Sequence, residues 1–343
     1  MKLCYFIHIK NMDFMKVAII GAGFAGLGTA WHLIQQNPDI DITIFDDLGI
    51  GGEASGIAAG LLHPFVGLRA KLNLYGNEAY ESTCRLLMES ENFLKETVYS
   101  KSGLLRMALT PSQQNDFLEC SKTNPDVKYL KNDECQNLNP ACASYPGILI
   151  AKGTTVYVKA YLKGLFLSLT QKGVKLEKSK INNLSDLKQF DKVIVTAGAG
   201  VKQFAELGPL EVFLIKGQTL ELEWPKDLQP LSVPLSSSSY ILMNQDKQSC
   251  IAGATYERNY LSSFRDQAFA QNSIMPKTVA MIPGLKDAKI IDCKAALRVS
   301  TKDHMPIVEK INERLFVYVG LGSKGLLYHS FFAEKLAMLC LKV

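Results

Sequence analysis

The chain has 343 residues, of which 47% are hydrophobic and 21% are charged, a balance typical of a soluble globular protein with one large or two modest domains. Its net charge of +5 is mild and its lysines and arginines are scattered, so it contains no basic arm of the kind that binds nucleic acid. This composition permits an RNA partner without indicating one.

The eight cysteines include no C-x-x-C pair and no metal-ligand spacing, which predicts free thiols, a reducing cytoplasmic compartment and no metal site. Residues 1–13 are interpreted as an N-terminal extension. Its short apolar patch, Leu3–Ile9, is followed by no cleavage pattern of a secretory signal, and Met12 or Met15 is an alternative start.

The first strong pattern is a glycine fingerprint between a strand and a helix. The apolar run Val17–Ile20 predicts a strand, and Gly21, Gly23 and Gly26 follow it before a helical segment, Leu27–Gln36. In a dinucleotide fold the first glycine permits the tight turn, the second lets the backbone approach a pyrophosphate, and the third lets helix and strand pack closely. The N-terminus of the helix then offers unpaired N–H groups to the phosphates.

An acidic residue stands at the spacing that such a fold requires. The β-branched segment Asp41–Phe45 predicts a second strand, and Asp46 follows it twenty residues after Gly26, where a carboxylate accepts hydrogen bonds from a ribose hydroxyl. The alternative is that Asp46 and Asp47 are ordinary turn residues. A membrane span over Val17–Ile34 is a second alternative, against which its glycines and its minimal length argue.

The rest of the chain alternates between predicted helices and strands. Thr110 is expected to cap a helix that starts at Pro111. Alternating strands between residues 210 and 251 indicate an antiparallel sheet. We expect further helices over residues 77–98, 132–139, 159–172 and 258–275 and an amphipathic helix ending at Leu341, with strands over 174–176, 192–196, 211–215, 219–224, 240–243 and 315–319.

Two stretches favour FAD over NAD as the nucleotide. The loop from Ser55 to Pro64 is built of small residues and suits the wall of a flat ring, and Gly320–Gly325 places a second glycine-led helix start after a strand. Because the given sequence continues for only eighteen residues beyond Gly325, we do not expect this turn to belong to a second dinucleotide unit. A helix start there would stabilise negative charge on a reduced flavin, and Lys324 either adds to this effect or is a solvated lysine.

Taken in chain order, the motifs resemble those of the D-amino-acid oxidase superfamily of FAD-dependent oxidoreductases, over nearly the whole chain. Thr196–Gly200 resembles the inner glycine motif of that superfamily, and Lys216-Gly-Gln218 resembles its R-G-Q step, with lysine in place of arginine. The stretch Ala296–Pro306, with the turn Gly320–Gly325, resembles glycine oxidases. It looks closer still to the oxidoreductase domain of the enzymes that process carboxymethylaminomethyluridine at the tRNA wobble position.

The resemblance implies an α/β fold in which a Rossmann-like FAD-binding domain is interleaved with an antiparallel-sheet substrate domain. The first would comprise residues 14–95, 150–210 and 290–343, and the second residues 96–149 and 211–289. FAD is expected to be held non-covalently, with Cys293 as a strand residue. The expected cofactor-binding residues are Gly21, Gly23, Phe24, Ala25, Gly26, Asp46, Asp47, Ser55, Gly56, Ala59, Gly60, Leu61, Ala197, Gly198, Gly322, Ser323, Lys324, Gly325 and Leu326.

Arg298 is the expected anchor for a substrate carboxylate, because glycine oxidases carry an arginine in a similar stretch and a guanidinium holds a carboxylate bidentately. The alternative is a structural salt bridge with Asp303 or Glu309. His63 and Tyr240 are expected to line the substrate pocket, with loop or sheet packing as their alternatives. The reaction implied by the family, hydride transfer to flavin N5 from the carbon beside an amine, requires little acid–base chemistry from the protein.

The leading hypothesis is therefore an FAD-dependent amine or amino-acid oxidoreductase that oxidises the C–N bond of a carboxylate-bearing amine. Its sharper form removes the carboxymethyl group from carboxymethylaminomethyluridine in tRNA, and its alternative acts on free glycine, sarcosine or a D-amino acid. A third hypothesis, from another class, is a flavin-binding partner protein without turnover. The expected partners are a small amine or a modified tRNA, with no membrane, and no signal indicates an oligomeric state.

Overall fold

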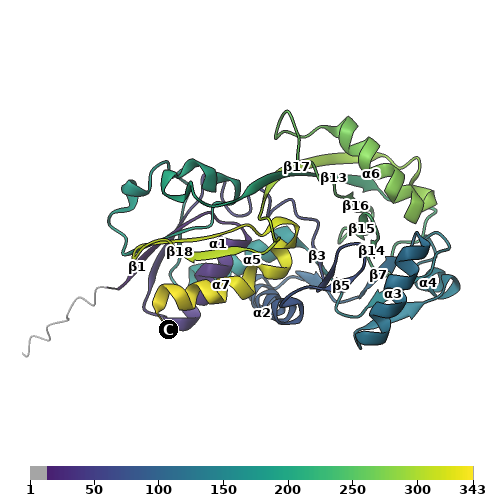
Figure 1. Ribbon diagram of the computed structural model, residues 1–343, viewed down its shortest axis with the longest axis horizontal. Helices are drawn as coiled ribbons and strands as arrows, with labels where there is room; N and C mark the ends of the chain where they lie inside the picture. Colours follow the sequence, from purple (N-terminus) through teal and green to yellow (C-terminus); the bar gives the residue numbers. More distant parts are fainter. Residues whose placement is uncertain (1–13, 343) are drawn as a thin grey trace, which may run out of the picture.

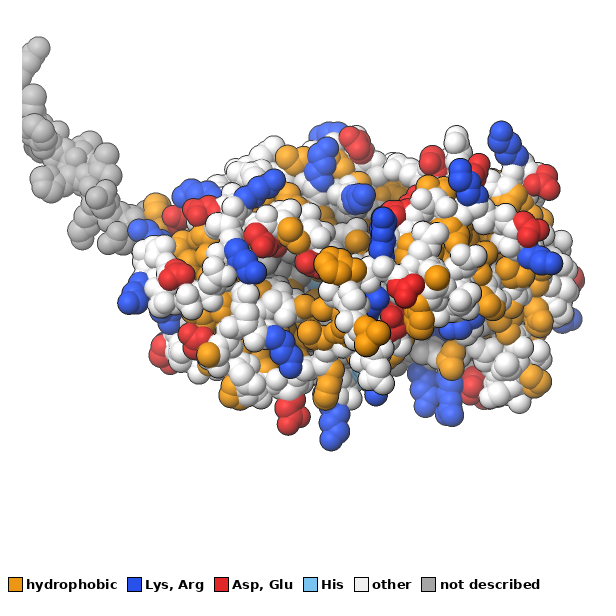
Figure 2. Space-filling view, turned by 90° about the horizontal axis from the view of Figure 1, so that it is seen from above, with side chains coloured by type: hydrophobic (Ala, Val, Ile, Leu, Met, Phe, Trp, Pro, Cys, Tyr) orange, Lys and Arg blue, Asp and Glu red, His pale blue; other side chains and the backbone are white. Residues whose placement is uncertain are grey.

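The computed structural model describes residues 14–342, so the predicted extension, residues 1–13, lies outside the described part of the chain. Two large sheets organise an elongated molecule, and the long strands β13 (Phe213–Glu223) and β17 (Ile290–Ser300) lie along one side of it (Figure 1). The mixed α/β fold of parallel and antiparallel sheets predicted from the sequence is confirmed. Basic, acidic and hydrophobic side chains are interspersed over the face seen in Figure 2.

The parallel sheet is built around the strand that precedes the glycine fingerprint. Five of its six strands are parallel, and the last, at one edge, is antiparallel to its neighbour. Their order is β11 (Lys175–Glu177), β2 (Asp41–Phe45), β1 (Lys16–Ile20), β12 (Lys192–Val195), β19 (Leu315–Val319) and β18 (Ile307–Lys310).

Side chains of β1 alternate between two hydrophobic layers. Val17 and Ile19 pack into a core shared with four helices, whereas Ala18 and Ile20 pack against the segment of short 3-10 helices between residues 184 and 207. Both faces of the central strand are thus covered, as parallel sheets require. The four helices are α1 (Phe24–Gln36), α2 (Gly76–Leu94), α5 (Val158–Gln171) and α7 (Gly325–Leu341).

The antiparallel sheet has eight strands, of which only the pair β14 and β7 is parallel. Helices α3 (Pro111–Thr123), α4 (Asn132–Leu138) and α6 (Gln267–Met281) accompany it (Figure 1). Its order is β17, β13, β16 (Ser249–Gly253), β15 (Tyr240–Met243), β14 (Leu235–Ser236), β7 (Leu104–Met107), β9 (Gly147–Ile150) and β8 (Val127–Leu130). Two small sheets are formed by β3 (Leu61–Leu62), β10 (Thr154–Val156) and β6 (Tyr99–Ser100), and by β4 (Phe65–Val66) and β5 (Lys71–Leu72).

Four predicted elements differ from the structure. The two strands expected over 211–224 form the single strand β13, because Gly217 continues the ladder opposite Ala296. The helix expected from residue 258 begins at Gln267, where the Asp266 carboxylate caps it by accepting a hydrogen bond from the backbone N–H of Phe269. The final helix is buried on several sides, because it packs against both α1 and α2, and is not amphipathic.

The predicted helix cap, the strand and helix within Val17–Ile34 and the unpaired cysteines are confirmed. The Thr110 side chain caps α3 by accepting from the backbone N–H of Gln113. The segment Val17–Ile34 is divided between β1 and α1, and no helix within residues 14–342 has the length and apolarity to cross a membrane. The seven cysteines of the described chain are all unpaired and buried.

Candidate active site

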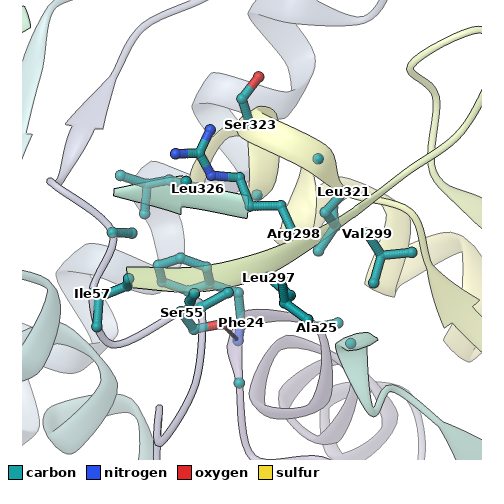
Figure 3. A pocket seen from close by; sticks show the side chains of 18 of the residues that line it. Phe24, Ala25, Ser55, Ile57, Leu297, Arg298, Val299, Leu321, Ser323 and Leu326 are labelled. Atoms are coloured by element: carbon teal, nitrogen blue, oxygen red, sulfur yellow. Dashed lines mark hydrogen bonds between the residues drawn. The ribbon is translucent and has the colours of Figure 1, made fainter. Parts of the chain in front are cut away.

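Two adjoining cavities form one long groove between the parallel sheet and strand β17. One end is lined by Asp46 and Asp47 and the other by Arg298, and both cavities share a wall that includes Gly23 and Ser55. Figure 3 shows the Arg298 end, with Phe24, Ser55 and Leu326 around it. The groove therefore runs from the glycine fingerprint to the predicted substrate anchor.

The fingerprint glycines leave no room for side chains. Gly21 has a φ of +110°, in the region that favours glycine. A methyl group on Gly26 would overlap the carbonyl oxygen of Gly21, and one on Gly23 would lie 2.7 Å from the Ser55 hydroxyl. The hydroxyl of Ser55 in turn accepts a hydrogen bond of 3.0 Å from the backbone N–H of Phe24, at the start of α1. The close helix–strand packing predicted for Gly26 is what the structure shows.

Asp46 anchors the turn at the other end of the groove. Its carboxylate accepts hydrogen bonds from the backbone N–H groups of Ala22 (2.8 Å), Leu48 (3.0 Å) and Gly49 (2.8 Å). A carboxylate offers about four lone-pair positions, so one remains for a ligand. Asp46 is thus a turn residue and is also placed where a ribose hydroxyl would be bound, which stays a prediction.

The small-residue loop after Asp47 lines the middle of the groove. Ala59, Gly60 and Leu61 face the Arg298 end, and Gly60 has a φ of +94°. Gly56 lines neither of the two cavities. It packs against Gly51, and a methyl group on Gly56 would overlap the carbonyl oxygen of Gly51. The loop therefore contributes its backbone and small side chains to the wall, as expected for most of these residues.

The inner glycine motif closes the groove from the side of β12. Gly198 lines both cavities and Ala197 lines the Asp46 end. Thr196 joins this motif to the fingerprint, because its hydroxyl donates to the carbonyl oxygens of Ile20 (2.9 Å) and Gly21 (3.1 Å).

The C-terminal turn supplies the wall beside Arg298. Gly322, Ser323, Gly325 and Leu326 line the cavity, together with Phe24 and Ala25 of α1. The expectation that Lys324 binds the cofactor is corrected, because the structure does not place its ammonium group in the cavity. The Lys324 Nζ donates to the carbonyl oxygen of His304 at 3.1 Å and lies 5.2 Å from the centre of the Tyr328 ring, and burial lowers its pKa.

Arg298 is the only charged side chain that the described residues contribute to its cavity. It stands on β17 opposite Ile215 of β13, and its guanidinium lies directly over Gly217. Neither Asp303 nor Glu309 forms an ion pair with it, and no carboxylate of residues 14–342 lies within 4.0 Å of its guanidinium nitrogens. The alternative of a structural salt bridge is therefore not what the structure shows.

Gly217 is a site residue whose role the sequence did not reveal. Any side chain there would overlap the guanidinium of Arg298, so the glycine is what lets the arginine lie flat on the sheet. The available signal was a glycine inside a strand, which often marks such a close approach.

The flanking residues of Gly217 support the sheet. Lys216 is buried and pairs with Glu257 at 3.7 Å. Gln218 donates to the Glu257 carboxylate at 3.0 Å and accepts from the backbone N–H of Asp266 at 2.6 Å. These contacts tie the loop after β16 to β13.

Tyr240 lines the cavity, whereas His63 does not. Burial raises the pKa of the Tyr240 hydroxyl, an effect that nearby Arg298 opposes. His63 lies instead beside Arg106, where burial and then that guanidinium lower its pKa to about 3. Arg106 donates to the carbonyl oxygens of Phe65 (3.0 Å) and Gly67 (2.6 Å), so His63 belongs to a structural loop contact. The expectation that it lines the substrate pocket is corrected.

The groove fits the predicted FAD. Along its length the groove offers four features that this cofactor needs: a free acceptor position on Asp46, a close backbone turn, a helix N-terminus and a wall of small residues. Within the described residues, no group of His, Cys, Asp and Glu side chains is arranged to hold a metal. Cys293 is a buried residue of β17, as expected.

Relatives of known sequence cover nearly the whole chain. It is 27% identical to the uncharacterized oxidoreductase YurR of Bacillus subtilis strain 168, over 94% of each chain. It is 22% identical to the tRNA 5-methylaminomethyl-2-thiouridine biosynthesis bifunctional protein MnmC of Pseudoalteromonas atlantica, over 94% of this chain and 55% of that protein. The chain thus spans about half the length of the MnmC relatives that it matches.

Solved structures share the fold. Glycine oxidase from Geobacillus kaustophilus superimposes with a TM-score of 0.83 at 19% identity, covering 96% of this chain and 95% of that chain. Iminodiacetate oxidase from Chelativorans sp. BNC1 superimposes with a TM-score of 0.81 at 24% identity, covering 95% of both.

The family match decides the cofactor and the class of enzyme. Residues 16–339 match the DAO family, described as FAD dependent oxidoreductase. The predicted cofactor, fold and enzyme class are confirmed by this match and by the shared fold. The chain therefore belongs to the DAO family of FAD-dependent oxidoreductases.

Proposed function

We propose that the protein oxidises the C–N bond of a secondary amine that carries a carboxylate. The observation that carries this proposal is the lone Arg298 in a cavity to which the described residues contribute no carboxylate and no histidine. A buried or partly buried cation without a partner favours a ligand that brings a negative charge. Two relatives in fold are named glycine oxidase and iminodiacetate oxidase, and both names refer to amines that carry a carboxylate, the second of them a secondary amine.

FAD, when bound, supplies the acceptor for a hydride from the substrate. The role left to this chain is positioning: Arg298 would hold the carboxylate in a bidentate grip, and the walls formed by Leu297 and Leu326 would keep water away from the reacting carbon. Because the described residues contribute no carboxylate, histidine or lysine to the cavity that could take a proton from the amine, the amine must enter in its neutral form. Loss of hydride from the CH₂ between nitrogen and carboxylate leaves an iminium ion. Addition of water to its carbon and transfer of a proton to the nitrogen then break the C–N bond and release glyoxylate and the shorter amine.

The substrate that we favour is the carboxymethylaminomethyl group of a tRNA wobble uridine. The support is the similarity to MnmC proteins along 94% of this chain, together with the resemblance of the stretch around Arg298. A free glycine-type amine is the second candidate, favoured by the fold shared with glycine oxidase and iminodiacetate oxidase.

Anaerobic reduction of the FAD-loaded protein separates the two candidates. We expect tRNA from cells that lack this protein to bleach the flavin absorbance and to release glyoxylate. Glycine, sarcosine and D-alanine should bleach it far more slowly at matched concentrations. Rapid bleaching by a free amino acid, with none by the tRNA, would instead assign the small-molecule function.

A further inference from the structure

A groove on the surface adjoins the Arg298 cavity and combines cations with exposed aromatic rings. Phe213 and Tyr256, which line it, are 52% and 50% exposed, although large aromatic side chains are usually buried. The side chains that give the groove its character are those of Lys202, Phe213, Tyr256, Arg258, Lys302 and His304. We call this set the basic groove.

The basic groove lies next to the predicted substrate anchor. Ile215, which lines the groove, is the direct strand partner of Arg298, and Ser300, also in its wall, stands two residues beyond Arg298 on β17. Alternate residues of a strand face the same side about 7 Å apart. A methyl group on Gly322, in the wall of the Arg298 cavity, would lie 3.4 Å from the Ser300 hydroxyl, so the two hollows share this boundary.

The charges of the basic groove are unpaired. Lys202, Arg258 and Lys302 are exposed, and none forms an ion pair with another side chain of the described chain. The Glu257 carboxylate, beside Arg258 in sequence, turns inward to Lys216. The one carboxylate next to Lys302, that of Asp303, accepts a hydrogen bond from the backbone N–H of Met305.

We propose that the basic groove binds the RNA strand next to the wobble nucleotide while that nucleotide occupies the Arg298 cavity. The inference rests on the proposed tRNA function and names the surface that such a substrate would use. Unstacked bases of an RNA loop stack on exposed aromatic rings, and phosphates pair with unpaired lysines and arginines. Arg258, 5.8 Å from the centre of the Tyr256 ring, places a cation and a stacking face together.

Charge reversal tests the cations. The variant Lys202→Glu/Arg258→Glu/Lys302→Glu is compared with Lys163→Glu/Lys277→Glu/Lys286→Glu, which makes the same charge change at exposed lysines elsewhere that form no ion pair. Binding to tRNA from cells lacking this protein is measured by fluorescence anisotropy over a range of salt, alongside anaerobic flavin reduction. We expect about a ten-fold or greater rise in the Kd of the groove variant and a salt slope smaller by about 2, since each phosphate contact on a single strand contributes about 0.7.

An aromatic substitution tests stacking independently. Tyr256→Ala should weaken tRNA binding by about five-fold or more, whereas Tyr256→Phe, which keeps the ring, should bind like the unaltered protein. Reduction by a high concentration of sarcosine, however slow, should be equal in all these variants, because none of the altered side chains lines the Arg298 cavity.

The outcomes separate this inference from the proposed function. If the unaltered protein is reduced by the modified tRNA and the groove variants bind it as tightly as the controls, the groove does not bind RNA and the tRNA function stands. Failure of the tRNA to bind or reduce the unaltered protein would overturn both.

Discussion

The parallel sheet and the antiparallel sheet contribute to the site in different ways. Around β1 the site is made of backbone, because Gly21, Gly23 and Gly26 admit no side chain and the helix start presents N–H groups. Around β13 and β17 it is made of side chains, above all Arg298 and Tyr240. The cofactor half is therefore specified by local sequence and the substrate half by contacts across strands. A substitution in the first should impair FAD binding, and one in the second should impair reaction with substrate while FAD stays bound.

Removal of the anchor should give the largest effect. Each charged hydrogen bond contributes about 1.5–3 kcal/mol, so Arg298→Ala is expected to lower kcat/KM by roughly 100-fold or more while FAD stays bound. Arg298→Lys should recover only part of the loss, because an ammonium group lacks the bidentate geometry. Steady-state kinetics and the flavin spectrum together decide this; equal kcat/KM in the alanine variant would remove the anchor assignment.

The buried ion pair should set the stability of the antiparallel half. Lys216→Met leaves the Glu257 carboxylate buried without its cation and should lower the free energy of unfolding by about 3–5 kcal/mol. The double variant Lys216→Met/Glu257→Leu should recover much of that loss. Denaturant unfolding measures both, and additive losses in the double variant would show that the two side chains are not coupled.

Closing the space at Gly26 should damage the cofactor half. Gly26→Ala forces a methyl group onto the carbonyl of Gly21, with an expected loss of about 1–3 kcal/mol in stability and loss of bound FAD. Gly284→Ala is the control, because Gly284 is exposed, lines neither cavity, and its methyl group would meet only the end of the Leu228 side chain, at 3.2 Å. A Gly26→Ala protein that retains stoichiometric FAD would contradict the assigned role of this turn.

Acid should destabilise the helix layer over the parallel sheet. Burial lowers the pKa of His329 from 6.5 to about 4, and its ring is hydrogen-bonded to the Tyr161 hydroxyl at 2.6 Å. The unfolded chain binds the proton more readily than the folded protein does. The contribution of His329 to the free energy of unfolding is therefore complete above pH 6.5 and falls as the pH drops toward 4. Through this residue alone, the free energy of unfolding should fall by about 2 kcal/mol between pH 7 and pH 5.

Thermal unfolding at both pH values, compared with a His329→Asn variant, isolates this effect. The variant should lose less stability between pH 7 and pH 5 than the unaltered protein. Identical losses in the two proteins would show that His329 does not titrate in this way.

The smallest effect expected concerns the fit beneath Arg298. Gly217→Ala should displace the guanidinium and lower kcat/KM by about ten-fold, equivalent to about 1.4 kcal/mol, with little change in bound FAD. Gly208→Ala, in an exposed turn, should be neutral. Unchanged kinetics in Gly217→Ala would mean that Arg298 does not need its observed position.

The contrast between the halves also explains what the sequence could predict. Strands β1, β2, β12 and β19 and the fingerprint were predictable, because their signals are short runs of adjacent residues. The start of α6 was not, because Glu257 and Gln218 hold the preceding loop in contact with β13. The basic groove was the feature least predictable from the sequence, because the fold brings its lining residues together from positions between 202 and 304.

The same reasoning accounts for the two site residues that were misplaced. Lys324 lies between two lining residues and His63 lies two residues after another, Leu61, but the direction of each side chain depends on a distant partner. The carbonyl oxygen of His304 holds the first, and the second lies beside Arg106. Adjacency to a motif does not specify which way a side chain points.

The central claim is that Arg298 selects an amine by its carboxylate. It is tested most directly by anaerobic stopped-flow reduction of the flavin with two tRNAs that differ only at the wobble uridine. One tRNA carries a carboxymethylaminomethyl group and the other a methylaminomethyl group. Sarcosine and dimethylamine form the corresponding pair of small molecules. The account predicts flavin bleaching by the carboxylate-bearing member of a pair and at least about a 100-fold slower reaction with the other. Equal bleaching by both members, or by neither member of either pair, would contradict it.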